Sequence, residues 1–280
     1  MRKGLIGKII HRLPQNAMSR TMGKITASRF SRVAIRRYVH HYKIDLDVVE
    51  KPVGEYRTLK EFFARRLKPS ARPIATAPGA IVSPVDGKVS QLGDIMHGTL
   101  IQAKGKEYSV AELLGDHEEL ASRFYGGKFI TIYLSPRDYH RIHMPVDGTL
   151  EQYTYLPGRL YPVNDIGVQQ VDCLFARNER LITFVKSEEA GCVAVVKVGA
   201  LFVGSVKVTY NRATTNVKHG RVHNEQIAGH PHLDKGQELG WFEFGSTVIL
   251  LFEKGRMDWV PGLREGSVLQ MGQQLGQIDE

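Results

Sequence analysis

The chain has 280 residues, enough to bury one large core or two small ones. Hydrophobic residues make up 42% and charged residues 24%, values that are ordinary for a globular protein and exclude a disordered chain. Glycine and proline follow no period, which excludes a collagen, and no apolar run reaches the length of about 18 residues that indicates a transmembrane helix. The only cysteines, Cys173 and Cys192, cannot build a disulfide scaffold or a four-cysteine zinc module, so we expect two buried thiols.

The net charge of +9 is concentrated at the N-terminus. Residues 1–50 hold eleven lysines and arginines against three acidic residues, which makes this segment +8 and leaves the remainder of the chain at +1. A basic arm on a nearly neutral body predicts a polyanionic partner, either a membrane surface or a nucleic acid.

Two stretches of the arm have helical spacing. Apolar residues recur from Leu5 to Leu13 until Pro14 ends the pattern, and a second helix is predicted over residues 25–42. Basic residues alternate with the apolar ones in both stretches, which is typical of amphipathic helices in a membrane interface. A helix packed on the body with its charges in water, or a mitochondrial presequence, would show the same pattern, and we prefer the membrane interpretation. The predicted apolar face of the second helix comprises Phe30, Val33, Ala34, Tyr38 and Tyr42.

The remainder of the chain is rich in short strands. The capping box from Thr58 to Glu61 predicts a helix over residues 59–67, and a proline-rich extended connector follows over residues 68–80. A second capping box begins at Ser109 and predicts a short helix that Gly115 ends. No regular strand–helix alternation is present, so the pattern favours an α+β fold with a β-rich core of packed or curved sheets. Strands are predicted at residues 81–82, 88–91, 128–134, 193–208 (two strands) and 247–252.

Candidate chemistry is concentrated after the strand that ends at Leu134. The standard nucleotide-binding, zinc-protease and serine-hydrolase motifs are absent, so catalytic groups must be sought elsewhere. His140 and His143 lie in a dense polar loop, where two imidazoles could serve as general base and acid, as metal ligands or as structural residues. Asp86 lies in a tight turn, where it could simply bond its own backbone. Residues 219–232 hold four more histidines in what we expect to be a mobile loop, with metal binding as a weaker alternative.

Three Gly-Ser pairs are candidates for backbone chemistry, and composition does not choose between them. The pair Gly245-Ser246 differs in its context, because it joins an aromatic segment to the apolar run of the predicted strand at 247–252. A strained peptide at that position could be attacked by its own serine hydroxyl, provided that a base takes the proton. The other two pairs begin at Gly204 and Gly266.

Several segments, in order, resemble the bacterial phosphatidylserine decarboxylases. They include Ser-Pro-Val-Asp-Gly-Lys-Val at 83–89, the histidine loop with its flanks at 133–145 and Phe-Gly-Ser-Thr-Val at 244–248. The similarity runs from about Tyr42 to Phe252, and its one visible departure is Phe244, where the family usually has leucine. The remaining matching segments are 56–63, 174–180 and 235–240.

The resemblance implies a pyruvoyl-dependent carboxy-lyase made from a self-cleaving proenzyme. Cleavage between Gly245 and Ser246 would yield a β chain of residues 1–245 and an α chain of residues 246–280, with the pyruvoyl cofactor formed from Ser246. That group would form a Schiff base with phosphatidylserine, release carbon dioxide and yield phosphatidylethanolamine. By position, Asp86, His143 and Ser246 would form the self-cleavage triad, with His143 as base and Asp86 as its orienting group, and His140 would act in decarboxylation. No metal is implied.

The resemblance also gives the arm a purpose. We expect residues 1–50 to be a basic amphipathic membrane-associating region and residues 51–280 to be the catalytic domain. The enzyme is then expected to be peripheral, on the cytoplasmic face of the bacterial cell membrane, where it meets phosphatidylserine in an anionic bilayer. We further expect a homodimer and no nucleic-acid partner. The alternatives are a catalytically inactive membrane-binding protein of the same fold and a metal hydrolase that uses the histidines.

Overall fold

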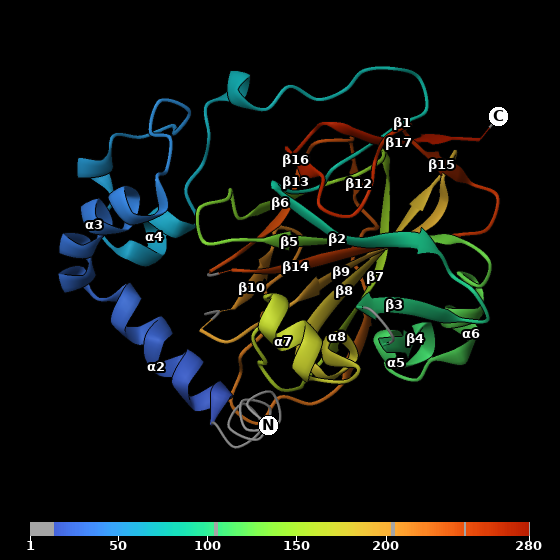
Figure 1. Ribbon diagram of the computed structural model, residues 1–280, viewed down its shortest axis with the longest axis horizontal. Helices are drawn as coiled ribbons and strands as arrows, with labels where there is room; N and C mark the ends of the chain where they lie inside the picture. The colour runs from blue at the N-terminus through green and yellow to red at the C-terminus, as the bar shows by residue number, and fades with distance from the viewer. Residues whose placement is uncertain (1–13, 104–105, 203–204, 244, 280) are drawn as a thin grey trace.

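The computed structural model describes residues 14–103, 106–202, 205–243 and 245–279. A β-rich body occupies most of the molecule, and the N-terminal helices α2, α3 and α4 gather at one side of it (Figure 1). This arrangement confirms the predicted α+β fold with an N-terminal helical region. The α-helices are α2 (Gln15–Ala27), α3 (Arg32–Tyr42), α4 (Leu59–Phe63), α5 (Val110–Leu114), α6 (Glu118–Ser122), α7 (Asp165–Gln170) and α8 (Leu174–Arg177), with short 3₁₀ turns at Arg29–Ser31, Val53–Glu55 and Pro69–Ala71.

One nine-stranded antiparallel sheet is the centre of the body. Its order is β11-β7-β8-β9-β14-β5-β2-β16, with β12 pairing β7 at the edge. Strand β14 lies in the middle and is buried along its whole length, which agrees with its apolar run from Val248 to Phe252. The strands of this sheet are β2 (Gly87–Asp94), β5 (Lys128–Leu134), β7 (Gly148–Leu156), β8 (Arg180–Ser187), β9 (Gly191–Val198), β11 (His223–Gln226), β12 (His232–Leu233), β14 (Ser246–Phe252) and β16 (Val268–Leu269).

Three smaller sheets complete the body, with the orders β1-β17-β15, β10-β13-β6 and β3-β4. The large sheet carries an apolar core on each face, one beneath helices α5 to α8 and the other beneath the three-stranded sheets. Cys192 is buried as expected, whereas Cys173 is partly exposed. The remaining strands are β1 (Ala80–Val82), β3 (Thr99–Ala103), β4 (Lys106–Ser109), β6 (Arg141–His143), β10 (Val206–Val208), β13 (Glu238–Phe242), β15 (Met257–Trp259) and β17 (Gln274–Ile278).

The predicted strands at 128–134 and 247–252, the two strands within 193–208 and the capped helix after Ser109 are all confirmed. The helix predicted over 59–67 is shorter, because residues beyond Phe63 turn back to pair with an earlier segment. The amide of Lys68 donates to the carbonyl of Val48, and Val49 forms a β-bridge with Leu67. Backbone that is bonded in this way cannot continue a helix.

The helical region differs in two respects from its prediction. The stretch predicted over residues 25–42 is divided between the end of α2, a 3₁₀ turn and α3, while the helix predicted from Leu5 to Leu13 lies outside the described residues. The predicted apolar face is also divided. Tyr38 and Tyr42 pack against a small core with Phe62, whereas Phe30 is 88% and Val33 is 83% exposed. The exposed pair is therefore free to contact another surface.

Candidate active site

The site is built where two chain connections lie side by side. Strand β5 continues through residues 135–140 into β6, and strand β13 continues through residues 243–245 into β14. Strands β5 and β14 pair, with Leu134 opposite Ser246, and strands β6 and β13 pair, with Arg141 opposite Trp241. The amide of Phe242 donates to the carbonyl of His140, which closes the arrangement. The two pairings thus bring the histidine loop to the Gly245-Ser246 peptide, although the two segments lie about a hundred residues apart in the sequence.

Ser246 differs from the other two candidate serines in its environment. Its side chain is fully buried at the first position of β14, and its Oγ has no hydrogen-bond partner among the described residues. The hydroxyl of Ser205 donates to the Glu243 carboxylate, and that of Ser267 accepts from the Arg264 amide. A buried hydroxyl without a partner is costly, and such a group often marks a functional site.

His140 is the imidazole nearest to this peptide. Its Nδ1 bonds the carbonyl oxygen of Asp138 over 2.8 Å, so Nδ1 carries the proton and Nε2 holds the free lone pair. Nε2 is buried, has no partner among the described residues and lies 3.8 Å from the position that a Cβ atom would take at Gly245. Burial, together with the nearby Arg65 charge, lowers the pKa of His140 to about 3. The ring is therefore neutral at physiological pH.

His143 is held in a different way. Its Nδ1 donates to the carbonyl of Gly236 over 2.8 Å, and its Nε2 accepts a hydrogen bond from the hydroxyl of Tyr139 over 3.0 Å. Burial lowers the pKa of His143 below its usual value. No hydrogen bond joins His143 to Ser246 within the described residues, because both ring nitrogens are already occupied.

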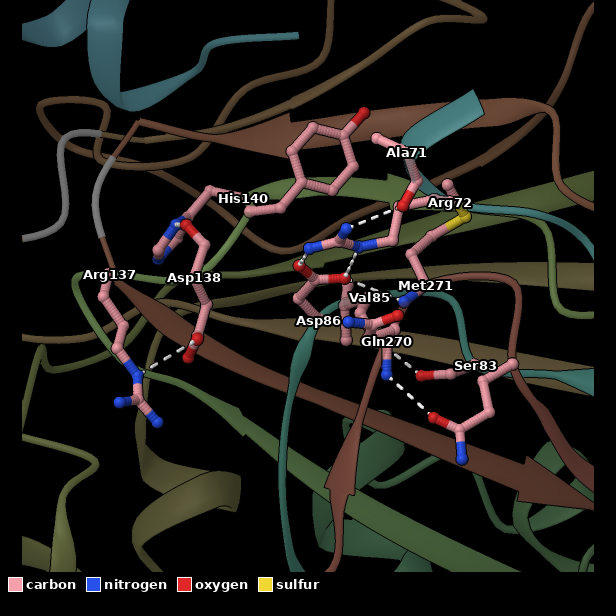
Figure 2. Close-up of polar contacts among 12 residues, drawn as sticks. Ala71, Arg72, Ser83, Val85, Asp86, Arg137, Asp138, His140, Gln270 and Met271 are labelled. Atoms are coloured by element: carbon pink, nitrogen blue, oxygen red, sulfur yellow. Dashed lines mark hydrogen bonds and ion pairs between the residues drawn. The ribbon is translucent and has the colours of Figure 1, made fainter. Parts of the chain in front are cut away.

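Asp86 lies in the turn between β1 and β2, beside β6, where the amide of His143 donates to the carbonyl of Pro84. Figure 2 shows its carboxylate between the guanidinium of Arg72 and the backbone of Met271. Arg72 donates twice, from Nε over 2.8 Å and from Nη2 over 2.5 Å, and the Met271 amide donates over 2.8 Å. The structure thus brings His140 to the Gly245-Ser246 peptide, while Asp86 is bonded to neither His143 nor Ser246.

An apolar cavity opens onto the Gly-Ser peptide. It measures about 360 Å³, and Gly245 forms part of its wall. Helix α3 contributes two tyrosines and α4 contributes Phe63, whose ring also packs on His140 with a centroid distance of 4.0 Å. Apolar walls with few polar groups are typical of a pocket that takes a small organic molecule. The remaining lining comprises Tyr133, Leu134, Pro136, Pro162, Val163, Asn164, Ala200, Leu201 and Phe202.

Two further observations were not predicted from the sequence. Glu243, three residues before Ser246, is buried and forms an ion pair with Lys60 over 2.6 Å in addition to its bond with Ser205. Its only sequence signal is an acid between two aromatic residues. The histidines of 219–232 are also arranged differently from expectation, since His223 begins β11 and His232 begins β12, so this segment forms edge strands. No three His, Cys, Asp or Glu side chains are grouped to hold a metal ion in the part of the chain that the structure describes.

The sequence matches one family of known proteins. The family model described as phosphatidylserine decarboxylase matches residues 59–277, which include Asp86, His140, His143, Gly245 and Ser246. A phosphatidylserine decarboxylase proenzyme of Brevibacillus brevis is 70% identical over 275 residues, covering 98% of each chain. Proenzymes of the same name from Myxococcus xanthus and Idiomarina loihiensis are 45% and 43% identical, over 97% and 96% of this chain and 97% and 95% of their own. The chain therefore belongs to the phosphatidylserine decarboxylase family.

Proposed function

We propose that this chain is a self-processing phosphatidylserine decarboxylase that cuts its own backbone between Gly245 and Ser246. The observation that carries the proposal is the buried, unpartnered Ser246 hydroxyl, beside a glycine that the free Nε2 of His140 faces. The family supports the activity, because the relatives at 70% and 45% identity are both named as proenzymes of this decarboxylase.

The residues fit a pyruvoyl group formed from Ser246. A serine that is to be converted in this way should be buried and free of competing hydrogen bonds. Ser246 is fully buried, and its Oγ has no hydrogen-bond partner among the described residues. The adjoining apolar cavity admits an organic substrate while limiting water. When present, the pyruvoyl ketone supplies an electron sink for the electron pair that remains when the carboxylate of phosphatidylserine leaves as carbon dioxide.

Self-cleavage uses groups of the chain itself. The Oγ of Ser246 attacks the carbonyl carbon of Gly245, a base takes the hydroxyl proton, and an ester replaces the amide. Elimination then releases the Gly245 carboxylate, and addition of water with loss of ammonia leaves the ketone on residue 246. We assign the base to His143 and its orientation to Asp86, as the resemblance implies. Since His143 is bonded to Tyr139 and Asp86 to Arg72, this assignment requires both groups to exchange partners before cleavage.

His140 is assigned to the decarboxylation half of the reaction. Its Nε2 faces residue 245 from within the protein, and its partner at Nδ1 fixes the ring. A neutral imidazole with one bare nitrogen can accept a proton and return it to a nearby carbon. The ring of Phe63 packs against the His140 ring at a centroid distance of 4.0 Å.

The N-terminal helices give the enzyme its membrane surface. Arg29, Arg32, Arg36 and Arg37 are exposed around the apolar side chains of Phe30 and Val33. In the described part of the chain, no helix is both long and apolar enough to cross a bilayer. We therefore propose that residues 1–50 bind an anionic bilayer peripherally, on the cytoplasmic face of the cell membrane, while residues 51–280 carry the catalytic site. We also propose a homodimer, in which each protomer consists of its own β and α chains.

Denaturing mass spectrometry tests the central proposal. The wild-type protein should give two chains that divide between residues 245 and 246, with the small chain lacking a free amine and reacting with borohydride. Ser246→Ala should remain one chain, and Ser205→Ala is the matched control that should still divide. If Ser246→Ala divides, or if Ser205→Ala alone blocks division, then the wrong serine has been identified.

A further inference from the structure

Arg65, which follows α4, is a buried cation beside the histidine loop. Arg65 is only 4% exposed, and its side chain forms no ion pair within the described residues. Nη2 donates to the carbonyl oxygens of Arg137 over 2.8 Å and Asp138 over 3.1 Å, while Nε and Nη1 have no partner in the same part of the chain. The guanidinium carbon lies 5.3 Å from the centroid of the Phe62 ring, but no carboxylate neutralises the charge, so its burial is costly and calls for an explanation beyond packing.

The carbonyl oxygen of Asp138 connects Arg65 to His140. It accepts one hydrogen bond from Arg65 Nη2 and another from His140 Nδ1. Because a carbonyl can only accept, the second bond requires the proton of the ring to lie on Nδ1. Arg65 holds the oxygen in place for this bond, and Phe63, two residues earlier, packs on the face of the same ring. One short segment therefore fixes both the plane of the imidazole and the acceptor that selects its tautomer.

The charge of Arg65 acts in the same direction. A fixed cation close to an imidazole disfavours a second positive charge. Burial is the larger cause of the low pKa of His140, and the Arg65 charge adds to it. The guanidinium thus favours the neutral ring as well as one of the two neutral tautomers.

We propose that Arg65 is a positioning residue that holds His140 in the Nδ1–H tautomer, with its bare Nε2 facing Gly245. The inference rests on the proposed function, because that function gives the exposed lone pair of His140 its purpose. A purely structural role for Arg65 makes a different prediction. Replacing Arg65 would then change the stability of the protein and leave the tautomer of His140 unaffected.

Nitrogen NMR of histidine-labelled protein tests the tautomer directly. The Ser246→Ala precursor is used, so that the readout depends on no cleavage or decarboxylation, and the His140 signals are assigned by their loss in His140→Gln. The test variant is Arg65→Met, which keeps an apolar side chain of similar length and removes the charge together with its two hydrogen bonds. Arg66→Met is the matched control, because the neighbouring side chain is 59% exposed and forms a 3.6 Å ion pair with Glu238.

We expect the parent and Arg66→Met to show the Nδ1–H tautomer alone, and Arg65→Met to show a mixture with the Nε2–H form. An unmixed Nδ1–H signal in Arg65→Met overturns the proposal, even if the decarboxylase assignment stands. A second measurement uses the matured enzymes on a soluble short-chain substrate. Arg65→Met should lower kcat about tenfold or more with KM unchanged, and Arg65→Lys should recover part of the loss because it restores the charge and one donor. A loss that Arg66→Met shares, or one confined to KM, contradicts the assignment.

Discussion

The hydroxyl of Tyr139 donates a hydrogen bond to Nε2 of His143 across 3.0 Å. This bond occupies the lone pair with which His143 would take the proton from Ser246. The uncut chain is therefore in a resting arrangement. The proposed base must release the hydroxyl of Tyr139 before its Nε2 can accept the proton of the Ser246 hydroxyl. The two rings also pack at a centroid distance of 5.6 Å, a contact that phenylalanine would retain.

Tyr139→Phe should accordingly accelerate self-cleavage. The lost bond is worth about 0.5–1.5 kcal/mol, which corresponds to roughly a two- to tenfold higher rate if the bond must break before the attack. The measurement is the half-life of the precursor after cell-free synthesis, followed on a denaturing gel. Slower cleavage in this variant would show that the hydroxyl positions His143 rather than restraining it.

The two histidines should separate the two halves of the reaction. His143→Ala should leave an uncut precursor, because the Ser246 hydroxyl loses its proposed base. His140→Ala should mature, yet its decarboxylation rate should fall by a factor on the order of 10² to 10⁴, the usual contribution of a positioned acid or base. Gel analysis and carbon dioxide release measure the two steps independently, and an equal loss of cleavage in both variants contradicts the division.

Removing one partner of the ion pair between Arg72 and Asp86 should destabilise the precursor strongly. Both side chains are largely buried, at 15% and 8% exposure, so Asp86→Asn strands a guanidinium in the protein interior. We expect a loss of about 3 kcal/mol in the free energy of unfolding. Arg66→Met should lose less than about 1 kcal/mol, because its ion pair is exposed. Urea denaturation of the uncut Ser246→Ala precursor measures both, and similar losses would refute the distinction.

Acid should destabilise the precursor through its buried histidines. The folded-state pKa of His140 is about 3, against about 6.5 in an unfolded chain, so the unfolded state binds more protons between these values. Stability should thus be complete above about pH 6.5 and fall as the pH decreases toward 3, by up to about 1.4 kcal/mol per pH unit for this group. His143 adds to the trend, since burial lowers its pKa as well. The urea midpoint of Ser246→Ala should depend on pH more steeply than that of a Ser246→Ala, His140→Gln double variant.

Vesicle flotation tests the membrane proposal. Each arginine near an anionic surface contributes about 1 kcal/mol, so changing Arg29, Arg32, Arg36 and Arg37 to glutamine should remove most of the salt dependence of binding. Residual binding should remain through the apolar side chains of the arm, and it should weaken further when the exposed Phe30 and Val33 are also changed to serine. Self-cleavage and activity on a short-chain soluble substrate should survive both sets of changes. Unchanged flotation of the four-arginine variant would show that the charges are ordinary solvated surface.

The elements predicted correctly from the sequence are those whose side chains pack into an apolar core. Strands β5 and β14 are long and apolar because they lie in the middle of the large sheet. Helix α2 gives no such signal, because its buried residues, Gln15, Ser19 and Thr26, are all polar. The sequence of strand β11 predicts a mobile loop for a related reason: all four of its residues are exposed, so no alternation of apolar residues is present.

The candidate site shows the same limit. A dense histidine loop and a Gly-Ser pair at the start of an apolar run can be found by inspection of the sequence. The partners of these residues cannot, because Arg72 meets Asp86 from an irregular connector and Arg65 meets His140 through a backbone oxygen. Hydrophobic periodicity carries no information about polar contacts between distant segments.

The position of β14 has a consequence for the life of the enzyme after cleavage. The strand begins at Ser246 and is hydrogen-bonded along both edges, to β5 and β9, while β17 pairs β1 further along the same fragment. If the chain is cut between residues 245 and 246 as proposed, the short α chain stays hydrogen-bonded in the centre of the β chain without a covalent link. Unfolding of the mature protein separates two molecules, so its recovery becomes a bimolecular reaction that depends on concentration, whereas the uncut precursor refolds as one molecule. The two chains would therefore be assembled correctly only once, when the uncut precursor folds and before the peptide bond between them is broken.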